Sequence, residues 1–390
     1  MVRNENVRNC ELIFSQNISD NKYNNKIKRH LTFKNMRFHY KIRTEIFTGD
    51  HIYEIINVMN YIWRTYNQKI PITFDLGSFE FYDKLVYVIL ESLCYYLLKE
   101  KNHSINIIFH AKHTIWSEGI QYSPLQCIDV SNKKTLFIHK YHSDLRMRHF
   151  RRLVPKKENR DEKYLSKLMQ DISCFLQNNA IAPDTCEQLS EALIELVGNA
   201  GEHGNAESII DIDITSTEYA KKSDEENILY YGMNAVVLNY SPILFFEPLK
   251  KKLENNDNLT ERYELVKKAK VYHFEHLHKD YSVEDFYTIS SFQHKISGSL
   301  EKNELGGTGL TYLLQSLEEN SDTHLCYMLS GNRILFFEKD FMFYDDKHLI
   351  GFNQSRNYLS DIPNVNLLRK IQTYIPGVAY NLNYAIKREW

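Results

Sequence analysis

The stretch ALIELVGNAGEHGN (192–205) carries a helical pattern that ends in a glycine-containing turn. Apolar residues recur through it at helical spacing, and Glu195, Asn199 and His203 are interleaved with them at steps of four. Positions four apart lie on one face of an α-helix, so these side chains and Glu191 form one polar stripe opposite an apolar face. A merely solvated face would more often carry Lys, Glu and Gln, because Asn and Gly are poor helix formers. The stripe therefore indicates a functional site on a helix that packs against a sheet.

A second motif, ELGGTGLTYLLQSL (304–317), places three glycines directly before another helical pattern. Glycines allow a ligand to approach the backbone closely, and the N–H groups at a helix start favour an anion such as phosphate. The motif lacks the G-K-[ST] of a Walker A loop, and it does not open a first β-α unit as a Rossmann glycine motif would. By itself it is weak evidence, since tight turns also use glycine.

Composition sets limits on the class of protein. The chain has 390 residues and a formal net charge of -2, so no overall basic field argues for a nucleic-acid partner. The six cysteines are far apart and form no C-x-x-C pair, which fits a reduced compartment. The N-terminus lacks a signal-peptide pattern, and the most apolar stretch, 85–98, is too short to span a membrane. We expect a cytoplasmic protein without a membrane segment.

The pattern along the chain predicts an α/β fold with two domains behind a polar arm. Residues 1–40 are polar with little periodicity, and we expect an N-terminal arm there. Residues 41–150 alternate between strand and helix patterns, which predicts a sheet with helices on it. Pro155 and the charged run that follows it mark a boundary, so residues 155–390 form the second domain. In the front domain the expected elements are strands at 37–46, 71–77 and 104–111, and helices at 51–63 and 83–98.

The second domain is expected to be a mixed sheet with helices on one face. Asp184 is the predicted N-cap of the helix that carries the polar stripe. A polar stretch at about 247–304 is too long for a plain loop, and Thr260 and Ser282 start helical patterns within it, so we interpret it as a lid. The other expected elements are helices at 164–179, 310–319 and 367–373, strands at 209–215, 235–246 and 377–386, and a hairpin at 323–337 turning at 330–332.

Together, the two motifs resemble the GHKL superfamily of ATPases and kinases, which use the Bergerat fold. The resemblance covers roughly 161–390 and implies that ATP and Mg²⁺ are the cofactors. It implies that Asn199 ligates Mg²⁺, that Glu195 activates water, and that His203 lies beside the phosphates. It also implies that a glycine segment closes over the phosphates, formed by Gly307, Thr308, Gly309 and Leu310. The chemistry is consistent, because Mg²⁺ takes few protein ligands and a carboxylate one turn away can reach a water.

One motif of that superfamily is altered. Members normally carry D-x-G-x-G after the next core strand, with the Asp accepting a hydrogen bond from the adenine amine. Here the segment is LNYSPILFF (238–246), which places Asn239 at the Asp position and lacks both glycines. Asn239 can still accept from an amine, but charge-assisted hydrogen bonds are about twice as strong. The resemblance therefore assigns Asn239 to the base, with a weaker contact than usual.

The front domain has a resemblance of its own. ITFDLGSFEFYDKLVYVIL (72–90) is similar to the strand-loop-helix core of STAS domains, the fold of anti-sigma-factor antagonists. Asp75, Leu76, Phe79 and Asp83 fit that pattern, but Lys84 stands where the regulatory Ser would be. The resemblance thus implies a STAS-like domain that has lost its phosphorylation site and serves as an interaction or dimerisation platform.

These features predict a Mg²⁺-ATP-binding GHKL protein. The expected function is slow ATP hydrolysis with lid closure that switches contacts with a protein partner, in regulation or defence. Two alternatives stay open, a serine/threonine protein kinase of the anti-sigma type and a non-catalytic, nucleotide-gated interaction module. A protein partner is expected, a homodimer is an open alternative, and neither nucleic acid nor a membrane is expected as a partner.

Overall fold

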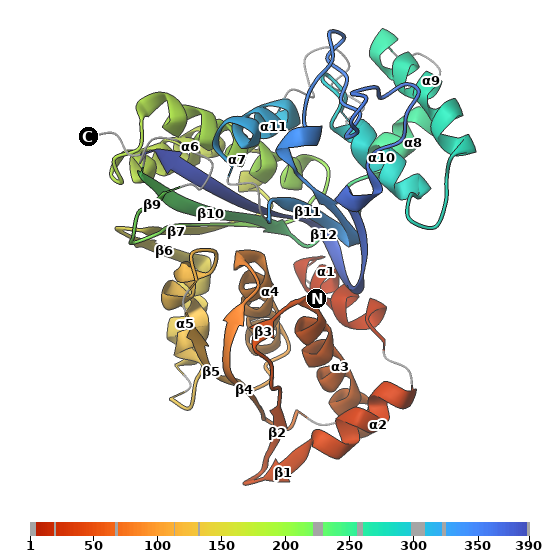
Figure 1. Ribbon diagram of the computed structural model, residues 1–390. Helices are drawn as coiled ribbons and strands as arrows, with labels where there is room; N and C mark the ends of the chain where they lie inside the picture. Colours follow the sequence, from red (N-terminus) through yellow and green to blue (C-terminus); the bar gives the residue numbers. More distant parts are fainter. Residues whose placement is uncertain are drawn as a thin grey trace.

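The computed structural model describes residues 5–18, 21–66, 69–112, 114–131, 133–220, 229–255, 260–297, 309–321 and 325–387. Within these residues the chain forms two β-sheets, with helices between the sheets and on the outer side of the second one (Figure 1). We call the first sheet and its helices, up to residue 142, the front module. The rest, from residue 143, is the back module.

The first sheet has a parallel core. Its strands are β1 (Thr32–Lys34), β2 (Arg37–Lys41), β3 (Ile46–Phe47), β4 (Ile72–Phe81) and β5 (Ile105–Lys112). Strands β2, β3 and β5 all pair with β4 in parallel, while β1 pairs with β2 antiparallel. Parallel neighbours need a crossover, and two helices supply it, α3 (Gly49–Tyr66) and α4 (Lys84–Tyr95). The alternation of strands and helices predicted for this part is confirmed.

The second sheet is antiparallel. Its strands are β6 (Ser143–Arg146), β7 (His149–Val154), β8 (Ser208–Ile214), β9 (Tyr219–Ala220), β10 (Leu229–Asn239), β11 (Tyr327–Phe336) and β12 (Leu368–Lys387). Their order is β11-β12-β10-β8-β7-β6, and β9 pairs with β10. The predicted α/β class is confirmed, but the mixed pairing expected in this sheet occurs in the first sheet instead. In the second sheet all the strand pairs described are antiparallel.

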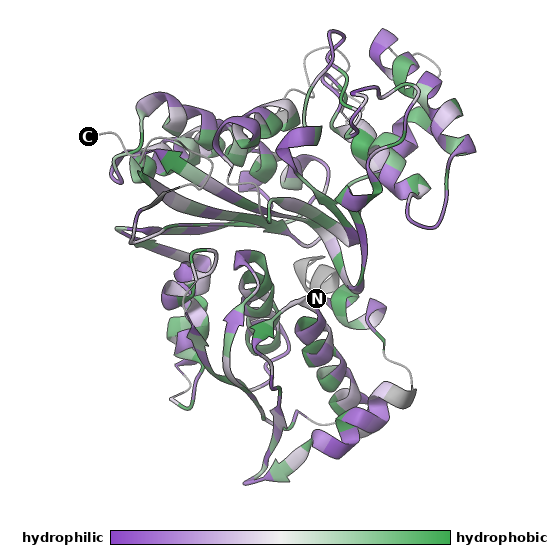
Figure 2. Ribbon diagram, in the orientation of Figure 1, coloured by the Kyte–Doolittle hydropathy of each residue, from purple (hydrophilic) through white to green (hydrophobic). Residues whose placement is uncertain are grey.

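Helices cover both faces of the second sheet. On one side lie α6 (Glu162–Gln177), α7 (Pro183–Glu202) and α11 (Gly309–Asn320), and on the other side lie α4 and α5 (Lys134–His142) of the front module (Figure 1). Helix α4 contacts β4 of the first sheet as well as β10 and β12 of the second. It is strongly apolar (Figure 2), which suits a helix buried between two sheets. One core therefore joins the modules, and a second core fills the space under α6 and α7.

The region predicted as a lid forms a small helical lobe. It consists of α8 (Glu247–Asn255), α9 (Glu261–Glu275) and α10 (Val283–Ser291), at one end of the second sheet (Figure 1). Thr260 is the N-cap of α9, and Ser282 with Asp285 forms a capping box at α10, so both predicted helix starts are confirmed. The lobe buries Tyr263 and Phe286 in the core of the back module, which distinguishes it from a bare loop.

The predicted N-terminal arm belongs to the front module. Residues 5–40 include helices α1 (Glu5–Gln16) and α2 (Asn21–His30) and strands of the first sheet. Ile13 and Ile27 are buried. The Asn17 amide donates to the Tyr374 carbonyl at 2.8 Å and accepts from the Tyr374 N–H at 2.7 Å, which ties this segment to β12. The prediction of a separate polar arm is therefore wrong for these residues, because a few apolar side chains in a polar segment suffice to anchor it.

The module boundary also differs from the prediction. Residues 41–150 were expected to form the front domain, but β6 and β7 pair with each other and β7 pairs with β8. The boundary therefore lies before Ser143 rather than at Pro155. The charged run after Pro155 lies on the surface between β7 and α6, within the back module.

Two secondary-structure predictions near the C-terminus are wrong. The expected turn at 330–332 lies inside the single strand β11, where Gly331 has a φ of 61° and produces a bulge in place of a reversal. The expected helix at 367–373 is the first part of β12, because this segment pairs with β11. Local sequence could not predict either structure, since the pairing between β11 and β12 determines the conformation of both segments.

The remaining regular elements are short. A π-helical turn continues α4, and 3₁₀ turns occur between the larger elements. Their bounds are Tyr96–Glu100 for the π turn and Glu118–Tyr122, Pro124–Cys127, Glu158–Arg160, Lys339–Phe341 and Val365–Leu367 for the 3₁₀ turns. Among the residues that the structure describes, no helix is both long and apolar enough to cross a membrane.

Candidate functional site

A cavity lies between α7, the end of β10 and the helical lobe. Its enclosed volume is about 80 Å³, and we call it the inner cavity. It is lined on its polar side by Glu195, Asn199, His203 and Asn239. The apolar side of the lining is formed mainly by Ile243, Leu244, Phe245, Leu249, Ile296, Leu310 and Val378. The cavity thus combines one polar wall with an apolar interior, as small-molecule sites commonly do.

A wider cleft of about 1090 Å³, which we call the outer cleft, adjoins the inner cavity. Glu195, Asn199 and His203 border both spaces, so α7 forms the wall between them. Besides Glu162, Glu247 and Glu254, the outer cleft receives four cationic side chains from outside α7. These are Arg160, Lys250, Lys251 and Lys252.

Helix α7 places the predicted stripe in the cavity wall. Glu195, Asn199 and His203 are half-buried, while Glu191, one turn earlier, is exposed. The helix ends at Glu202, and the His203 N–H donates to the Asn199 carbonyl at 3.0 Å. The predicted N-cap is wrong, because Ala182 is the cap and Asp184 lies in the first turn.

Asn239 is the last residue of β10, in the floor of the cavity. It pairs with Ser208 of β8 and Val378 of β12 and is 5 % exposed. Its side-chain Oδ1 is buried and has no hydrogen-bond partner among the described residues. A buried polar atom without a partner costs roughly 1–3 kcal/mol, so its presence beside a cavity points to a ligand group.

Two glycines from other segments surround Asn239. A Cβ on Gly377, whose φ is 85°, would lie 2.4 Å from the Asn239 carbonyl oxygen, and one on Gly204 would lie 2.9 Å from the Ala200 carbonyl oxygen. The Ser241 hydroxyl donates to the Gly204 carbonyl at 2.7 Å. Gly377 and Gly204 therefore let two other segments of the backbone pack closely around Asn239.

The glycine segment is only partly described. Gly307 and Thr308 lie outside the described residues. Gly309 is the first residue of α11, and Leu310 lines the inner cavity. The structure therefore brings Leu310 together with the α7 stripe and Asn239, although these residues come from three distant parts of the chain.

Tyr380 of β12 also lines the cavity, and sequence patterns gave no sign of it. Burial raises the pKa of its phenol, and the Glu195 carboxylate raises it further. Tyr380 was missed because it reads as one more residue of an alternating strand. The described residues contain no group of three or more His, Cys, Asp or Glu placed to hold a metal ion together.

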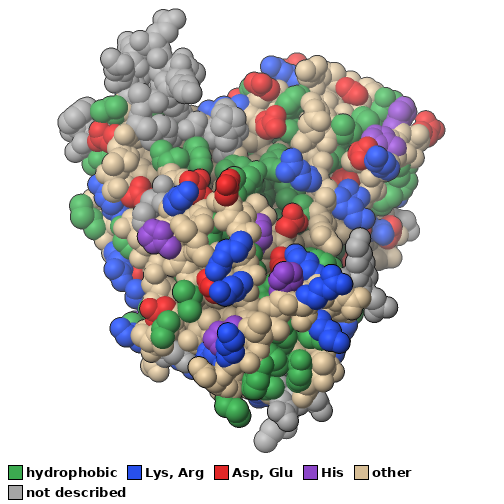
Figure 3. Space-filling view, turned by 60° about the horizontal axis from the view of Figure 1, so that its bottom comes forward, with side chains coloured by type: hydrophobic (Ala, Val, Ile, Leu, Met, Phe, Trp, Pro, Cys, Tyr) green, Lys and Arg blue, Asp and Glu red, His purple; other side chains and the backbone are tan. Residues whose placement is uncertain are grey.

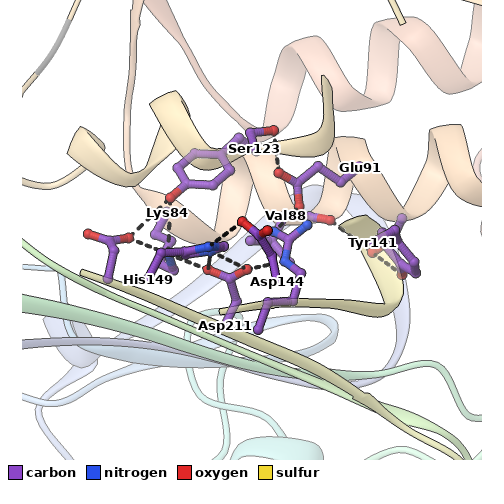
Figure 4. A network of polar contacts seen from close by, with 12 residues as sticks. Lys84, Val88, Glu91, Ser123, Tyr141, Asp144, His149 and Asp211 are labelled. Carbon is purple, nitrogen blue, oxygen red and sulfur yellow. Dashed lines mark hydrogen bonds and ion pairs between the residues drawn. The ribbon is translucent and has the colours of Figure 1, made fainter. Parts of the chain in front are cut away.

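On the opposite face of the second sheet, Lys84 joins the two modules. This first residue of α4 is fully buried, and its Nζ donates to Asp211 Oδ1 at 2.5 Å and to Asp213 (Figure 4). Both aspartates lie on β8. The Tyr87 hydroxyl lies 3.1 Å from the Lys84 Nζ and 3.3 Å from Asp213. The ammonium group is therefore held entirely by side chains at the module interface.

Arg151 of β7 makes a second link between the modules. It is buried, its Nε donates to Asp211, and its Nη2 donates to Glu91 Oε2 of α4 at 2.5 Å. The other oxygen of Glu91 accepts from the Ser123 hydroxyl at 2.5 Å (Figure 4). Each carboxylate at this interface thus has more than one hydrogen bond, as buried charges require.

His149 extends the network to the edge of the sheet. Its Nδ1 lies 3.1 Å from Asp144 and its Nε2 lies 3.3 Å from Asp211. Burial alone would lower the pKa of His149, but the two carboxylates outweigh it and raise the pKa. We call this network the charged cluster. It consists of Lys84, Glu91, Asp144, His149, Arg151, Asp211 and Asp213.

The charges of the cluster shift the pKa values of its buried members. Burial would raise the pKa of Asp211, but the charges of Arg151 and Lys84 hold it well below the usual value. The pKa of Lys84 is raised, because its two aspartates outweigh the burial that would lower it. At Glu91 burial wins over Arg151 and raises the pKa, since the negative charge of Asp211 acts in the same direction.

Asp83, the residue directly before α4, is also buried at this interface. Asp83 caps α4 by accepting from the Val86 N–H at 3.0 Å, and it accepts from the Tyr327 hydroxyl of β11 at 2.7 Å. The Leu85 N–H donates to the Asn381 side chain of β12 at 3.1 Å. Burial raises the pKa of Asp83 to about 6, although these hydrogen bonds oppose the shift.

This arrangement gives Lys84 a structural role. The sequence marked it only as the residue at the position of a regulatory Ser, whereas the structure places it in a buried ion pair with the other module. The N-terminus of α4 is therefore covered by the second sheet. Asp75, by contrast, lies on the outer side of the first sheet, while Leu76 and Phe79 are buried in the core.

Compared with protein families, curated proteins and solved structures, the chain matches none. The geometry of the cavity and of the module interface is therefore the evidence from which function is inferred.

Replacing Lys84 with Met should strongly destabilise the protein. Removing one partner of a buried ion pair leaves its carboxylates without compensation, and we expect a loss of about 3–5 kcal/mol in the free energy of unfolding. Urea unfolding followed by circular dichroism measures this loss. Lys99→Met is the control, because Lys99 is exposed and should change stability by less than about 0.5 kcal/mol. Equal effects of the two substitutions would contradict the role of Lys84.

Asp83 should make stability depend on pH. Its pKa of about 6 in the folded state lies above the value of an unfolded Asp, so the folded state binds the proton more tightly. The free energy of unfolding therefore decreases as pH rises from about 4 to about 6. Asp83→Asn removes this contribution, and the variant should gain about 1 kcal/mol relative to wild type between pH 5 and pH 7.5.

Urea unfolding of both proteins at pH 5 and pH 7.5 tests this prediction. Asp346→Asn is the control, since Asp346 is exposed and its substitution should give no such pH-dependent difference. The prediction fails if Asp83→Asn and wild type differ by the same amount at both pH values.

Proposed function

We propose that the back module is a GHKL-type nucleotide-binding domain that binds Mg²⁺-ATP in the inner cavity and outer cleft and hydrolyses it slowly. The observation that carries the proposal is the convergence of Glu195, Asn199 and His203 with Asn239 and Leu310 on one cavity. These residues were selected from sequence motifs alone, and their meeting at one place supports the proposal.

The shape of the site suits a nucleotide that uses both spaces. The inner cavity alone is smaller than the roughly 300–1,000 Å³ typical of small-molecule sites, whereas the outer cleft adds the missing room. The base would lie in the apolar inner cavity, near the unpartnered amide oxygen of Asn239. The phosphates would lie at the polar wall and in the outer cleft, where Arg160, Lys250 and Lys251 supply positive charge.

The donor set also suits the cofactor. The Asn199 side-chain oxygen, together with phosphate oxygens, would hold Mg²⁺, which usually keeps few protein ligands and neutralises phosphate charge when bound. Glu195, one helical turn away, would accept a proton from the attacking water. His203 and, from α8, Lys250 and Lys251 would offset the remaining phosphate charge. Because α8 belongs to the helical lobe, its contacts with phosphates would couple the nucleotide to the position of the lobe.

The lobe provides the link to a partner protein. We propose that its position differs between the nucleotide-bound and nucleotide-free states, and that this difference switches the contacts that the protein makes in regulation or defence. Transfer of phosphate to the front module is disfavoured, because Lys84 holds the acceptor position and is buried.

The proposal predicts different effects for two residues of the stripe. Glu195→Gln should bind Mg²⁺-ATP about as well as wild type but release phosphate at least about 100-fold more slowly, because the general base is lost. Asn199→Ala should weaken Mg²⁺-ATP binding by about tenfold or more, because a metal ligand is lost. Calorimetry and a phosphate-release assay measure the two quantities.

Glu191→Gln is the matched control, since Glu191 belongs to the same stripe but is exposed, and both quantities should stay at wild-type values. Absence of ATP binding by wild type would overturn the assignment. Binding without phosphate release would support the non-catalytic alternative, and transfer of labelled phosphate to a second protein would support the kinase alternative.

A further inference from the structure

The first sheet has an inner face and an outer face. Side chains alternate along a strand, and Phe38, Tyr40 and Phe74 point inward, where they are buried. Helix α4 packs on this inner side of β4. The alternate residues point outward, and Ser78 and His110 among them are exposed. The outer face, which we define by these alternate residues of β1, β2, β4 and β5 and by Arg43, is therefore a surface of the molecule.

This outer face is basic, although the whole chain has a formal net charge of -2. Its acidic side chains are Asp75 and Glu80, and Asp75 is paired with Arg43 at 2.8 Å. Its cationic side chains are Lys34, Arg37, Lys41, Arg43 and Lys112, with His39 and His110 beside them. Figure 3 turns the bottom of the view of Figure 1 forward, and Lys, Arg and His side chains gather in its lower half, with some Asp and Glu among them. This face would therefore attract a negatively charged surface.

Apolar side chains are exposed on the same face and at its edge. Ile46 and Ile108 are 48 % and 36 % exposed, and they lie beside Glu80 and Asp75 in the strand register. At the turn between β1 and β2, Met36 is 79 % exposed. Apolar groups set among charged ones are typical of protein–protein interfaces. The face therefore has charges that can attract a partner and apolar surface that the partner can bury.

The composition of the face favours a protein over a nucleic acid. Sheets that bind single-stranded nucleic acid carry outward aromatic residues on which bases stack. The outward positions described on β2, β4 and β5 hold no Phe, Tyr or Trp.

We propose that the outer face of the first sheet docks a partner protein through an acidic surface. The proposal rests on the charge and exposure of the front module alone, so it does not depend on nucleotide binding in the back module. The partner would approach from the side of the first sheet that faces away from α4 and the second sheet. The interaction should weaken as salt concentration rises, because exposed charges are screened.

Charge reversal on the full-length protein tests the proposal. The probe is fluorescently labelled poly-L-glutamate of fixed length, which presents the chemistry of an acidic protein surface, and labelled poly-uridylate serves as the nucleic-acid probe. Fluorescence anisotropy at low and physiological salt measures binding. The variant carries Lys41→Glu and Lys112→Glu, two exposed positions on the outer face. The matched control carries Lys268→Glu and Lys279→Glu, two exposed positions in the helical lobe.

We expect wild type and the control to bind poly-L-glutamate equally, and the outer-face variant to bind it at least about tenfold more weakly. Thermal unfolding of all three proteins confirms that they are folded. The proposal is overturned if wild type does not bind poly-L-glutamate or if both variants lose binding to the same extent. It is also overturned if poly-uridylate binds more tightly than poly-L-glutamate and its binding is lost in the outer-face variant.

Discussion

The buried pairing of Lys84 with Asp211 and Asp213 fixes how the two modules are arranged. A buried ammonium group is tolerated only where carboxylates compensate it, so α4 can lie on the second sheet only where β8 presents them. Arg151 repeats the constraint a short distance away, because it reaches both β8 and Glu91 of α4. Two links of this kind set the position and the direction of the helix across the sheet. The apolar core between the sheets packs around the same helix.

The candidate nucleotide site lies on the other face of the same sheet. Its floor is the end of β10 with its neighbour β12, and its walls are α7, the helical lobe and the start of α11. Because the sheet is packed on both faces, the floor is held from below by the front module. The walls come from segments that are far apart in the chain, so the site exists only when the back module is folded.

Local sequence periodicity predicted much of the fold, because apolar spacing decides whether a segment is a helix or a strand. Examples are the polar stripe of α7, which follows from the spacing of residues, and the starts of the lobe helices, which follow from their capping residues. The charged cluster could not be predicted, because Asp211 and Asp213 read as polar positions of an ordinary alternating strand. Their partner Lys84 is more than 120 residues away in the chain. The contacts of Gly377 and Gly204 with Asn239 could not be predicted for the same reason, since only the fold brings these residues together.

Adjacent residues of the long strand β12 point to opposite faces of the second sheet. Tyr380 points into the inner cavity, while Asn381 points to the front module and accepts from the backbone of α4. A shift of register by one residue exchanges the faces of every side chain on a strand. A single inserted or deleted residue before Tyr380 would therefore send the amide into the cavity and the phenol toward α4. Relatives of this chain could therefore differ in the length of their loops, but the number of residues within β12 must stay the same.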